Sequence, residues 1–492
     1  GEVPLPEKAL EDALCDVAGG AVAASAAILK TKRSSWSVAS VLSEAERFSS
    51  SLESEGPLDA LVIVAGDEPL LDAALLSRML ENHGRYRADY SFADGYPQGF
   101  AAEILAPHAI PALRALAEKS AAGAVGTSDA GKVERGWLFS LIQKDINSFD
   151  IETDISPRDL RELRLDLACD TKRNSLLVER LMEAGVHDAA SALDYIPGHL
   201  EALRSLPAFL QVQVAGGCPQ ACALCPYPQV GGAILARRDF MPRERFAALV
   251  SAFASFAGEG VVDISLWGEP SFHPEVEGLV DDVLSHPSLS LIVETSGIGW
   301  KEGAFERLSA RWPERLHFVL SLDAVDPELY ASLRGPGFEE ALGSAGKLLS
   351  LFPKSAYIQT LRVHENEAAL EDFWRGWKKR TEHVIVQKYS RFAGFLPPRK
   401  VTDLSPLKRR PCWHLKRDLS VLLDGRVPLC RECVRDEIVL GNLFGEGEPT
   451  PKSIEERLAS IWIEGERYHK LHVSGDYPAP CAECDEYYTY NA

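Results

Sequence analysis

Apolar runs of strand length alternate with longer helical stretches along most of the chain, and the alternation is most regular after residue 208. Apolar runs separated in this way are typical of parallel strands that are covered by helices. The pattern therefore predicts an α/β fold whose main part is a partial parallel (β/α)6 barrel, with the chemistry at the carboxyl ends of its strands. The six strands are expected at 209–214, 261–267, 289–294, 316–323, 356–363 and 384–389.

The part of the chain before this barrel also alternates between strands and helices. An apolar run at 61–65 predicts a buried strand, and a helix is expected at 73–82. Asp67 follows the strand, and the carboxyl end of a parallel strand is where α/β sheets bind ligands. The predicted divisions are an α/β domain at 1–188, a linker broken by prolines at 189–207, the barrel at 208–395 and a small domain with a β-hairpin and a helix at 396–492.

The charge of the chain disfavours two classes of partner. The 492 residues include 72 acidic and 52 basic side chains, for a net charge of -20. Such a charge opposes nonspecific binding to nucleic acid or to an anionic membrane. The sequence has no apolar run of about 18 residues and no export signal, so we expect a cytoplasmic protein without a membrane partner.

One segment runs against this acidic trend. Between residues 371 and 417, 13 Lys or Arg stand against 4 Asp or Glu. Three explanations are open: the segment forms a solvated face, it eases reduction of a nearby iron site, or it recognises an acidic substrate.

Eight of the ten cysteines fall into two groups, and only Cys15 and Cys169 stand apart. Without an export signal, clustered cysteines favour metal ligands over disulfides. The first group follows the first barrel strand with the spacing C-x3-C-x2-C, which can bind three irons of a [4Fe-4S] cluster and leave the fourth open to a small molecule. Its members are Cys218, Cys222 and Cys225, and three structural cysteines at this spacing are the alternative.

This spacing resembles that of the radical SAM family. The resemblance implies that S-adenosylmethionine (SAM) binds the open iron and is cleaved by one electron to a 5′-deoxyadenosyl radical. It also implies a reductant such as flavodoxin or ferredoxin. The ends of the next three strands carry segments similar to the family's GGE, TNG and SLDG motifs, the last followed by an RG pair. The residues expected there to contact SAM or substrate are Trp267, Gly268, Glu269, Ser296, Ser321, Asp323 and Arg334.

The match to the family departs at two positions. Trp267 replaces the first glycine of the GGE motif, and Leu224 replaces the aromatic residue before the third cysteine, for which Tyr227 is the expected substitute. Two simpler roles stay open at the strand ends: Asp323 as the cap of the following helix, and Arg334 as a solvated side chain.

The second group of cysteines follows the barrel. An Asp-Gly turn at 424–425 predicts a β-hairpin with Cys430 on its return strand. The order of these cysteines, with a Leu-Gly-Asn-Leu segment at 440–443 among them, resembles the SPASM domain and implies one auxiliary [4Fe-4S] cluster, whereas a C-x2-C pair alone is also compatible with zinc. Cys433 is an additional cysteine, either a substitute ligand or a free thiol. The group consists of Cys412, Cys430, Cys433, Cys481 and Cys484.

The amino-terminal domain resembles GT-A nucleotidyltransferases in the Gly-Asp-Glu-Pro-Leu segment at 66–70 and in the segment at 165–171. The resemblance implies that Asp67 and Asp170 hold Mg²⁺ and a nucleotide. Lys172 and Arg173 depart from that family's pattern, so a degenerate domain, either structural or substrate-presenting, is the main expectation.

As a whole the chain resembles the spirochaete-type radical SAM/SPASM proteins, called spiro-SPASM, which carry a nucleotidyltransferase-like domain. The expected function is radical modification of a peptide, a protein or a small molecule. Two alternatives remain. One is a bifunctional enzyme whose first domain activates a sugar-like substrate with a nucleotide, and the other is a non-catalytic iron–sulfur electron-transfer or scaffold protein.

Overall fold

The structure is a computed structural model that describes residues 36–52, 58–123, 133, 135–402, 405–406, 408–435, 437–445 and 449–488. Cys15 lies outside these residues. The chain separates into two compact units: the first comprises Gly1–Asp170 with Asn174–His199, and the second comprises Thr171–Arg173 with Leu200–Ala492. The segments predicted as barrel and C-terminal domain thus belong to one unit.

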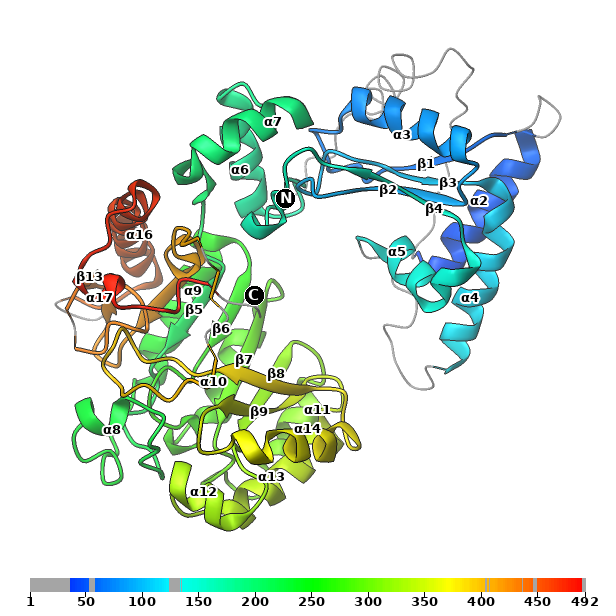
Figure 1. The fold of residues 1–492 in the computed structure, drawn as a ribbon. Helices are drawn as coiled ribbons and strands as arrows, with labels where there is room; N and C mark the ends of the chain where they lie inside the picture. Colours follow the sequence, from blue (N-terminus) through cyan, green and yellow to red (C-terminus); the bar gives the residue numbers. More distant parts are fainter. Residues whose placement is uncertain are drawn as a thin grey trace. The chain divides into compact units, whose positions relative to one another are not determined.

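The first unit contains a four-stranded sheet with the order β1-β3-β2-β4 (Figure 1). Only β2 and β4 run parallel, while β3 is antiparallel to both β1 and β2. The prediction of a buried parallel strand ahead of Asp67 is wrong: β1 is an antiparallel edge strand, and its Val62 is 41% exposed. An apolar run carries no information about the direction of the neighbouring strand. The elements are β1 (Leu61–Ile63), β2 (Tyr90–Asp94), β3 (Glu103–Leu105), β4 (Ile151–Ile155), α2 (Val38–Leu52), α3 (Ala73–Tyr86), α4 (Ile110–Gly123), α5 (Trp137–Ile142), α6 (Lys172–Glu183) and α7 (Ala189–Tyr195).

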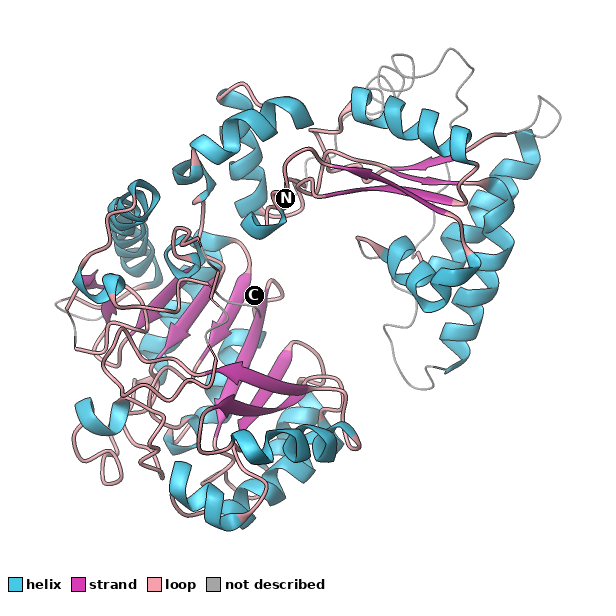
Figure 2. Ribbon diagram, viewed as in Figure 1, coloured by secondary structure: helices cyan, strands magenta, loops and turns pink. Residues whose placement is uncertain are grey.

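The second unit is built on a parallel seven-stranded sheet with the order β10-β9-β8-β7-β6-β5-β11, drawn in magenta in Figure 2. All six predicted strands are present, but the second ends at Asp263 and the fourth at Ser321, four and two residues earlier than expected. The motifs at 267–269 and 323 therefore lie in turns beyond the strands. The strands are β5 (Phe209–Val212), β6 (Gly260–Asp263), β7 (Leu289–Thr295), β8 (Leu316–Ser321), β9 (Ala356–Arg362), β10 (Val384–Lys388) and β11 (Asp418–Val421).

The seventh strand, β11, comes from the segment predicted as a separate domain. It pairs parallel with β5, with Asp418 opposite Phe209. The expected Asp-Gly turn does follow it, since the Leu422 N–H donates to the Arg426 carbonyl at 2.8 Å. The return strand β12 (Arg426–Pro428), however, pairs with β13 (Val439–Asn442) and not with β11. The turn thus joins β11, which completes the edge of the large sheet, to β12, and Cys430 lies beyond the end of this return strand, not on it as predicted.

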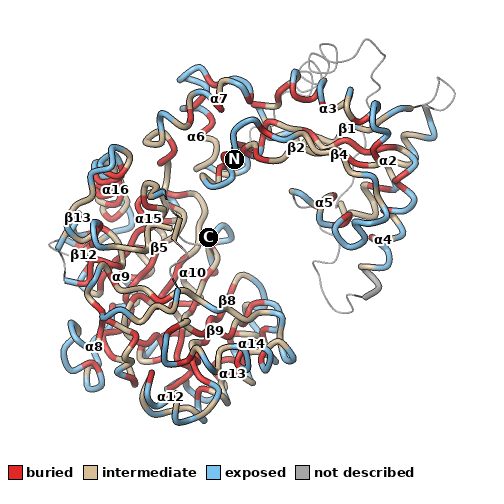
Figure 3. The backbone as a smooth tube through the Cα atoms, viewed as in Figure 1, coloured by how far each residue is buried: buried red, intermediate tan, exposed pale blue. Residues whose placement is uncertain are grey.

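Helices cover one face of the seven-stranded sheet. Leu291 and Val293 of β7 are fully buried in the same apolar cluster as Leu249 and Leu279 of the helices. The residues that alternate with them on β7, Ile292 and Glu294, face the other side, because alternate residues of a strand point to opposite faces. Figure 3 colours the buried residues of the chain red. The helices are α8 (Tyr227–Val230), α9 (Arg243–Ala257), α10 (Val276–Leu284), α11 (Ala304–Arg311), α12 (Pro327–Leu333), α13 (Phe338–Leu351) and α14 (Leu370–Lys378).

The end of the chain contributes α15 (Trp413–Arg417), α16 (Pro451–Ser474) and α17 (Ala479–Ala482), and α16 packs along α9. α16 begins at a capping box formed by Thr450 and Ser453 and ends at Gly475 in the left-handed region. Its buried Trp462 donates to the Ser205 carbonyl at 2.7 Å, which ties α16 to the residues before β5. Within the described part of the chain, no helix has the length and apolar character needed to cross a membrane.

Candidate active site

The first cysteine group lies on the loop that leaves β5, and glycines let this loop approach the neighbouring turn closely. The Glu269 N–H donates to the Gly217 carbonyl at 2.8 Å. A Cβ at Gly268 would lie 2.1 Å from the Ala215 carbonyl oxygen, and Gly268 has a positive φ of 78°. Only glycine fits this position without moving the backbone. The Gly-Glu motif therefore abuts the cysteine loop.

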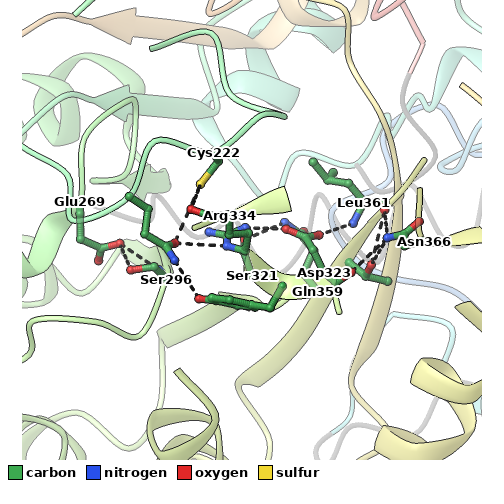
Figure 4. A network of polar contacts seen from close by, with 12 residues as sticks. Cys222, Glu269, Ser296, Ser321, Asp323, Arg334, Gln359, Leu361 and Asn366 are labelled. Atoms are coloured by element: carbon green, nitrogen blue, oxygen red, sulfur yellow. Dashed lines mark hydrogen bonds and ion pairs between the residues drawn. The ribbon is translucent and has the colours of Figure 1, made fainter. Parts of the chain in front are cut away.

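The other side of the loop is bound by the end of α12. The Ala223 N–H donates to the Leu333 carbonyl at 2.8 Å, and the Gln220 amide donates to the Tyr330 hydroxyl at 3.0 Å. The Cys222 thiol lies 3.8 Å from the Arg334 carbonyl oxygen (Figure 4). The segment corresponding to the family's RG pair thus positions the cysteine loop through backbone contacts that its sequence alone does not reveal.

The three thiols of this loop share a desolvated environment. Burial raises the pKa of Cys218 and Cys222 above the usual range and that of Cys225 to about 12. Near Cys222 the positive charge of Arg334 offsets part of this increase in pKa. Binding of iron would have to displace the thiol protons, which couples metal binding to deprotonation.

The two departures from the family pattern have a structural account. Trp267 adopts a positive φ of 50°, a conformation that glycine takes at no cost and that strains other residues. Its ring stacks on Tyr227 at 5.9 Å between centroids. The Tyr227 hydroxyl donates to the Gly216 carbonyl at 2.9 Å, so this buried ring holds the cysteine loop from the position two residues after Cys225.

Glu269 is buried and already has three donors. Its carboxylate accepts from the Thr295 hydroxyl at 2.5 Å and from the N–H and hydroxyl of Ser296 at 2.8 and 2.7 Å (Figure 4). Burial raises the pKa of Glu269, and these hydrogen bonds oppose the increase. Glu269 thus joins the turn after β6 to the turn after β7, and Thr295 is a partner that the motif comparison did not single out.

Asp323 and Arg334 form a buried ion pair at 2.5 Å (Figure 4). Asp323 is 1% exposed, has a positive φ of 61° and also accepts from the Leu361 N–H at 2.7 Å. The alternative roles are therefore wrong: Arg334 is not solvated, and Asp326 caps α12 by accepting from two backbone N–H groups. Ser321 accepts from the Gln359 amide at 3.3 Å.

Four cysteines of the second group, Cys412, Cys430, Cys433 and Cys481, lie in one cluster with apolar and aromatic side chains, and Cys484 follows in the same turn as Cys481. Two C-x2-C segments form the same turn, with the Cys433 N–H donating to the Cys430 carbonyl at 3.1 Å and the Cys484 N–H to the Cys481 carbonyl at 3.2 Å. Burial and then Cys430 raise the pKa of Cys412 to about 12. Burial, Cys430 and Cys412 together raise the pKa of Cys481 to about 12 as well. The three thiols therefore lie close to one another. Cys433 is 1% exposed within this cluster.

Part of the basic segment binds the last C-x2-C turn. Lys388 pairs with Glu486 at 3.0 Å, and Lys400 pairs with Asp485. Arg409 donates to the Cys481 carbonyl at 2.5 Å. A solvated face does not describe these three side chains, because their partners lie within or just after the cysteine turn.

In the first unit, the two aspartates predicted to hold Mg²⁺ lie on either side of a guanidinium group. Arg135 contacts Asp67 and Glu68 at 2.7 Å each and Asp170 at 3.7 Å. Nothing in the sequence pattern singles out Arg135, which lies 35 residues before Asp170. A divalent cation at Asp67 and Asp170 would have to displace this arginine. The magnesium and nucleotide hypothesis stays a prediction.

A cavity of about 530 Å³ lies elsewhere in the first unit. It is lined by Arg78, Tyr96 and Asp154 among others, and not by Asp67 or Asp170. Arg78 donates to both carboxylate oxygens of Asp154, at 2.7 and 2.9 Å, so the charged groups of the cavity already satisfy each other.

The donor sets in the second unit fit iron–sulfur clusters better than single metal ions. Among the residues that the structure describes, no group of three or more His, Cys, Asp or Glu side chains is arranged to hold a single ion. A [4Fe-4S] cluster takes one thiolate per iron, so its ligands stand farther apart than those of one ion. Three free thiols on one glycine-lined loop, and five more in the second group, four of which share one cluster, match that chemistry.

Comparison with known proteins gives the class of this site. Residues 212–374 match the model of the Radical SAM superfamily, which spans the cysteine loop and the strand-end motifs. These residues form a Radical SAM domain, so the protein is an enzyme of that kind, and the domain implies binding of SAM and of a [4Fe-4S] cluster. A protein of Treponema pallidum (strain Nichols), described as uncharacterized, is 38% identical over 371 residues, which cover 72% of this chain and 98% of that protein. The two proteins belong to one family.

Other similarities are shorter or more distant. A second Treponema pallidum (strain Nichols) protein, also described as uncharacterized, is 37% identical over 60 residues, or 12% of this chain and 27% of that protein. SuiB of Streptococcus suis, solved with its precursor peptide SuiA, has a TM-score of 0.43 and 15% identity over 70% of this chain and 89% of that chain. BtrN, solved with AdoMet and 2-DOIA, has a TM-score of 0.39 and 17% identity over 57% of this chain and 94% of that chain.

Proposed function

We propose that Cys218, Cys222 and Cys225 bind a [4Fe-4S] cluster and that the enzyme modifies a peptide, a protein or a small molecule by radical chemistry. The observation that carries this proposal is the three-thiol loop, fixed between the Gly-Glu turn after β6 and the end of α12. When bound there, the cluster and SAM supply one-electron cleavage of SAM to a 5′-deoxyadenosyl radical.

The residues around the loop have distinct tasks in this proposal. Glu269, held by Thr295 and Ser296, fixes the turn that faces the cysteine loop. The Asp323–Arg334 pair fixes the opposite side. Because both are buried and hydrogen-bonded, the loop is held in one geometry before SAM arrives, which lowers the cost of ordering on binding.

We also propose that Cys412, Cys430, Cys481 and Cys484 bind one auxiliary [4Fe-4S] cluster. The support is that Cys412, Cys430 and Cys481 share one cluster. Burial and Glu432, and then Cys412 and Cys430, raise the pKa of Cys484, so this thiol is close to the others. An electron carrier such as flavodoxin or ferredoxin is the proposed partner, because reductive cleavage of SAM needs an electron from outside the chain. The cytoplasm is the proposed location.

Anaerobic reduction of the reconstituted protein with SAM tests the main proposal. The wild type is expected to form 5′-deoxyadenosine and methionine. Cys222→Ala is expected to form neither, because two thiolates are too few to hold the cluster. Cys169→Ala is the matched control, since this exposed cysteine belongs to neither group. Equal product formation by wild type and Cys222→Ala would refute the proposal.

Iron content tests the auxiliary cluster. The reconstituted wild type is expected to hold about eight irons and Cys481→Ala about four, because the two ligand sets are separate. Cys433→Ala should keep the wild-type iron content. If it loses as much iron as Cys481→Ala, Cys433 belongs in the ligand set. About four irons with bound zinc in the wild type would instead assign the second group to a zinc site.

A further inference from the structure

The face of the seven-stranded sheet opposite the helices carries two carboxylates on neighbouring strands. Asp263 ends β6 and pairs in register with Ile292 of β7. Glu294 lies two residues after Ile292, so it shares a face with Asp263. The helix-facing neighbour Val293 is fully buried in the apolar core. The two carboxylates therefore lie together on the inner face of the partial barrel.

Asp263 has hydrogen-bond partners, but the Glu294 carboxylate has none. Asp263 accepts from the Gln211 amide at 3.2 Å and from the Ser265 N–H at 2.8 Å. For Glu294 only the backbone N–H is bonded, to the Ser265 hydroxyl at 2.8 Å. Across the residues that the structure describes, no hydrogen bond or ion pair reaches the Glu294 carboxylate. Burial raises its pKa to about 7, and Asp263 adds to this increase.

One arginine approaches this pair from the second cysteine group. Arg431 lies on the Cys430 turn, and its positive charge lowers the pKa of Asp263, Glu294 and Cys225. Arg431 therefore acts on the carboxylate pair from the turn that carries the second cysteine group.

The cations near Asp263 and Glu294 already pair with other carboxylates. Arg431 also pairs with Glu432, at 3.5 Å. Arg334 is committed to Asp323 at 2.5 Å, and Lys388 to Glu486 at 3.0 Å. The half-buried Glu294 carboxylate has lost part of its hydration without gaining a donor, and a cation that carries hydrogen-bond donors offsets that loss.

We propose that Glu294 and Asp263 form a binding site for a positively charged group of the substrate, a primary ammonium or a guanidinium. This inference rests on the proposed function, because it names the chemistry of the substrate that the radical reaches. Glu294 is the direct partner, Asp263 adds negative charge, and Arg431 limits the site to one cation. Two sources carry such a group: a basic side chain of a peptide and a small-molecule amine.

Calorimetric titration of the reconstituted enzyme with SAM tests the site with defined probes. Hexylammonium is expected to bind at one site, and 1-hexanol, its uncharged counterpart, is not. Glu294→Gln is expected to weaken hexylammonium binding at least tenfold, because a hydrogen bond to a charged group is lost. Glu339→Gln, an exposed carboxylate on α13, is the matched control and should bind as the wild type does. Equal binding of both probes, or equal affinity in Glu294→Gln, would overturn the inference.

A peptide arm distinguishes the two sources. The probes are the blocked tripeptide acetyl-Gly-Lys-Gly-amide and its counterpart with norleucine in place of lysine. Tighter binding of the lysine peptide than of hexylammonium assigns the site to a peptide substrate, and the reverse order assigns it to a small amine. The norleucine peptide should bind no better than 1-hexanol.

The failure of this inference can be told apart from failure of the proposed function. Formation of 5′-deoxyadenosine by the wild type is measured in the same preparation. A wild type that cleaves SAM but does not prefer the charged probes refutes the cation site alone. A wild type that binds hexylammonium through Glu294 but never cleaves SAM refutes the proposed function and leaves the site standing.

Discussion

Removal of Arg334 is expected to destabilise the second unit strongly. Asp323 is 1% exposed and its ion-pair partner Arg334 has a side chain that is 13% exposed. Breaking a buried ion pair leaves an uncompensated charge and typically costs about 3–5 kcal/mol. Asp323 keeps its hydrogen bond from the Leu361 N–H, so we expect the lower end of that range for Arg334→Gln, about 3 kcal/mol.

A second substitution separates lost charge balance from lost packing. Adding Asp323→Asn to Arg334→Gln removes the buried charge while keeping an oxygen for the Leu361 N–H. The double variant is therefore expected to be more stable than Arg334→Gln by at least about 1 kcal/mol. Arg311→Gln is the control: its pair with Asp281 is exposed, and such pairs contribute about 0–1 kcal/mol.

The assay is pulse proteolysis across a urea series, with peptides from residues 316–334 followed by mass spectrometry. This readout reports the folded fraction of the second unit without a contribution from the first. The reasoning is refuted if Arg334→Gln stays within about 1 kcal/mol of the wild type, or if Asp323→Asn destabilises it further.

Three further predictions follow from individual contacts. Gly268→Ala should reduce SAM cleavage at least tenfold, measured as 5′-deoxyadenosine, because a Cβ would lie 2.1 Å from the Ala215 carbonyl oxygen and the positive φ adds about 1–2 kcal/mol of strain. Arg135→Ala should create Mn²⁺ binding detectable by electron paramagnetic resonance in a protein that otherwise shows none there, and adding Asp67→Asn should remove it. His469 has a pKa lowered from 6.5 to about 3, chiefly by burial. As the pH falls, this histidine is therefore protonated in the unfolded chain before it is protonated in the folded protein. Stability should therefore be full above pH 6.5 and lower by about 3 kcal/mol at pH 4.5, and His469→Leu should remove that loss from urea unfolding curves.

Each of these variants has a counterpart that should not respond. Gly343→Ala lies within α13 with open space at the Cβ position, so it should leave SAM cleavage unchanged. Arg161→Ala removes an exposed arginine of the first unit and should create no Mn²⁺ binding. His187→Leu removes an exposed histidine and should keep the wild-type pH dependence. If a control variant responds as strongly as the variant with which it is paired, the contact behind that prediction does not have the proposed effect.

Much of the second unit was predictable because its signals are local. The six apolar runs become β5 to β10, since a strand buried between helices must be apolar whatever its neighbours are. The spacing of Cys218, Cys222 and Cys225 is likewise local, because one tight loop has to present all three thiols. The glycine at 268 is likewise predicted by a local motif, the Gly-Glu segment, and the structure supplies the steric reason for it.

What the sequence could not decide depends on which distant segments meet. The apolar run before Asp67 gave no direction for its neighbouring strand, and no local pattern announces that Arg135 lies between Asp67 and Asp170. Likewise, β11 joined the large sheet although the Asp-Gly turn after it predicted a local hairpin.

The same limit applies at the proposed site. Motif comparison singled out Glu269, but only the fold shows that three donors from the next turn already occupy its carboxylate. It also passed over Glu294, which no donor reaches in the described structure. The sequence motifs therefore predicted which residues are present at the site. Tertiary contacts decided which of them are satisfied and which remain open to a ligand, because partners for buried charges come from segments far apart in sequence.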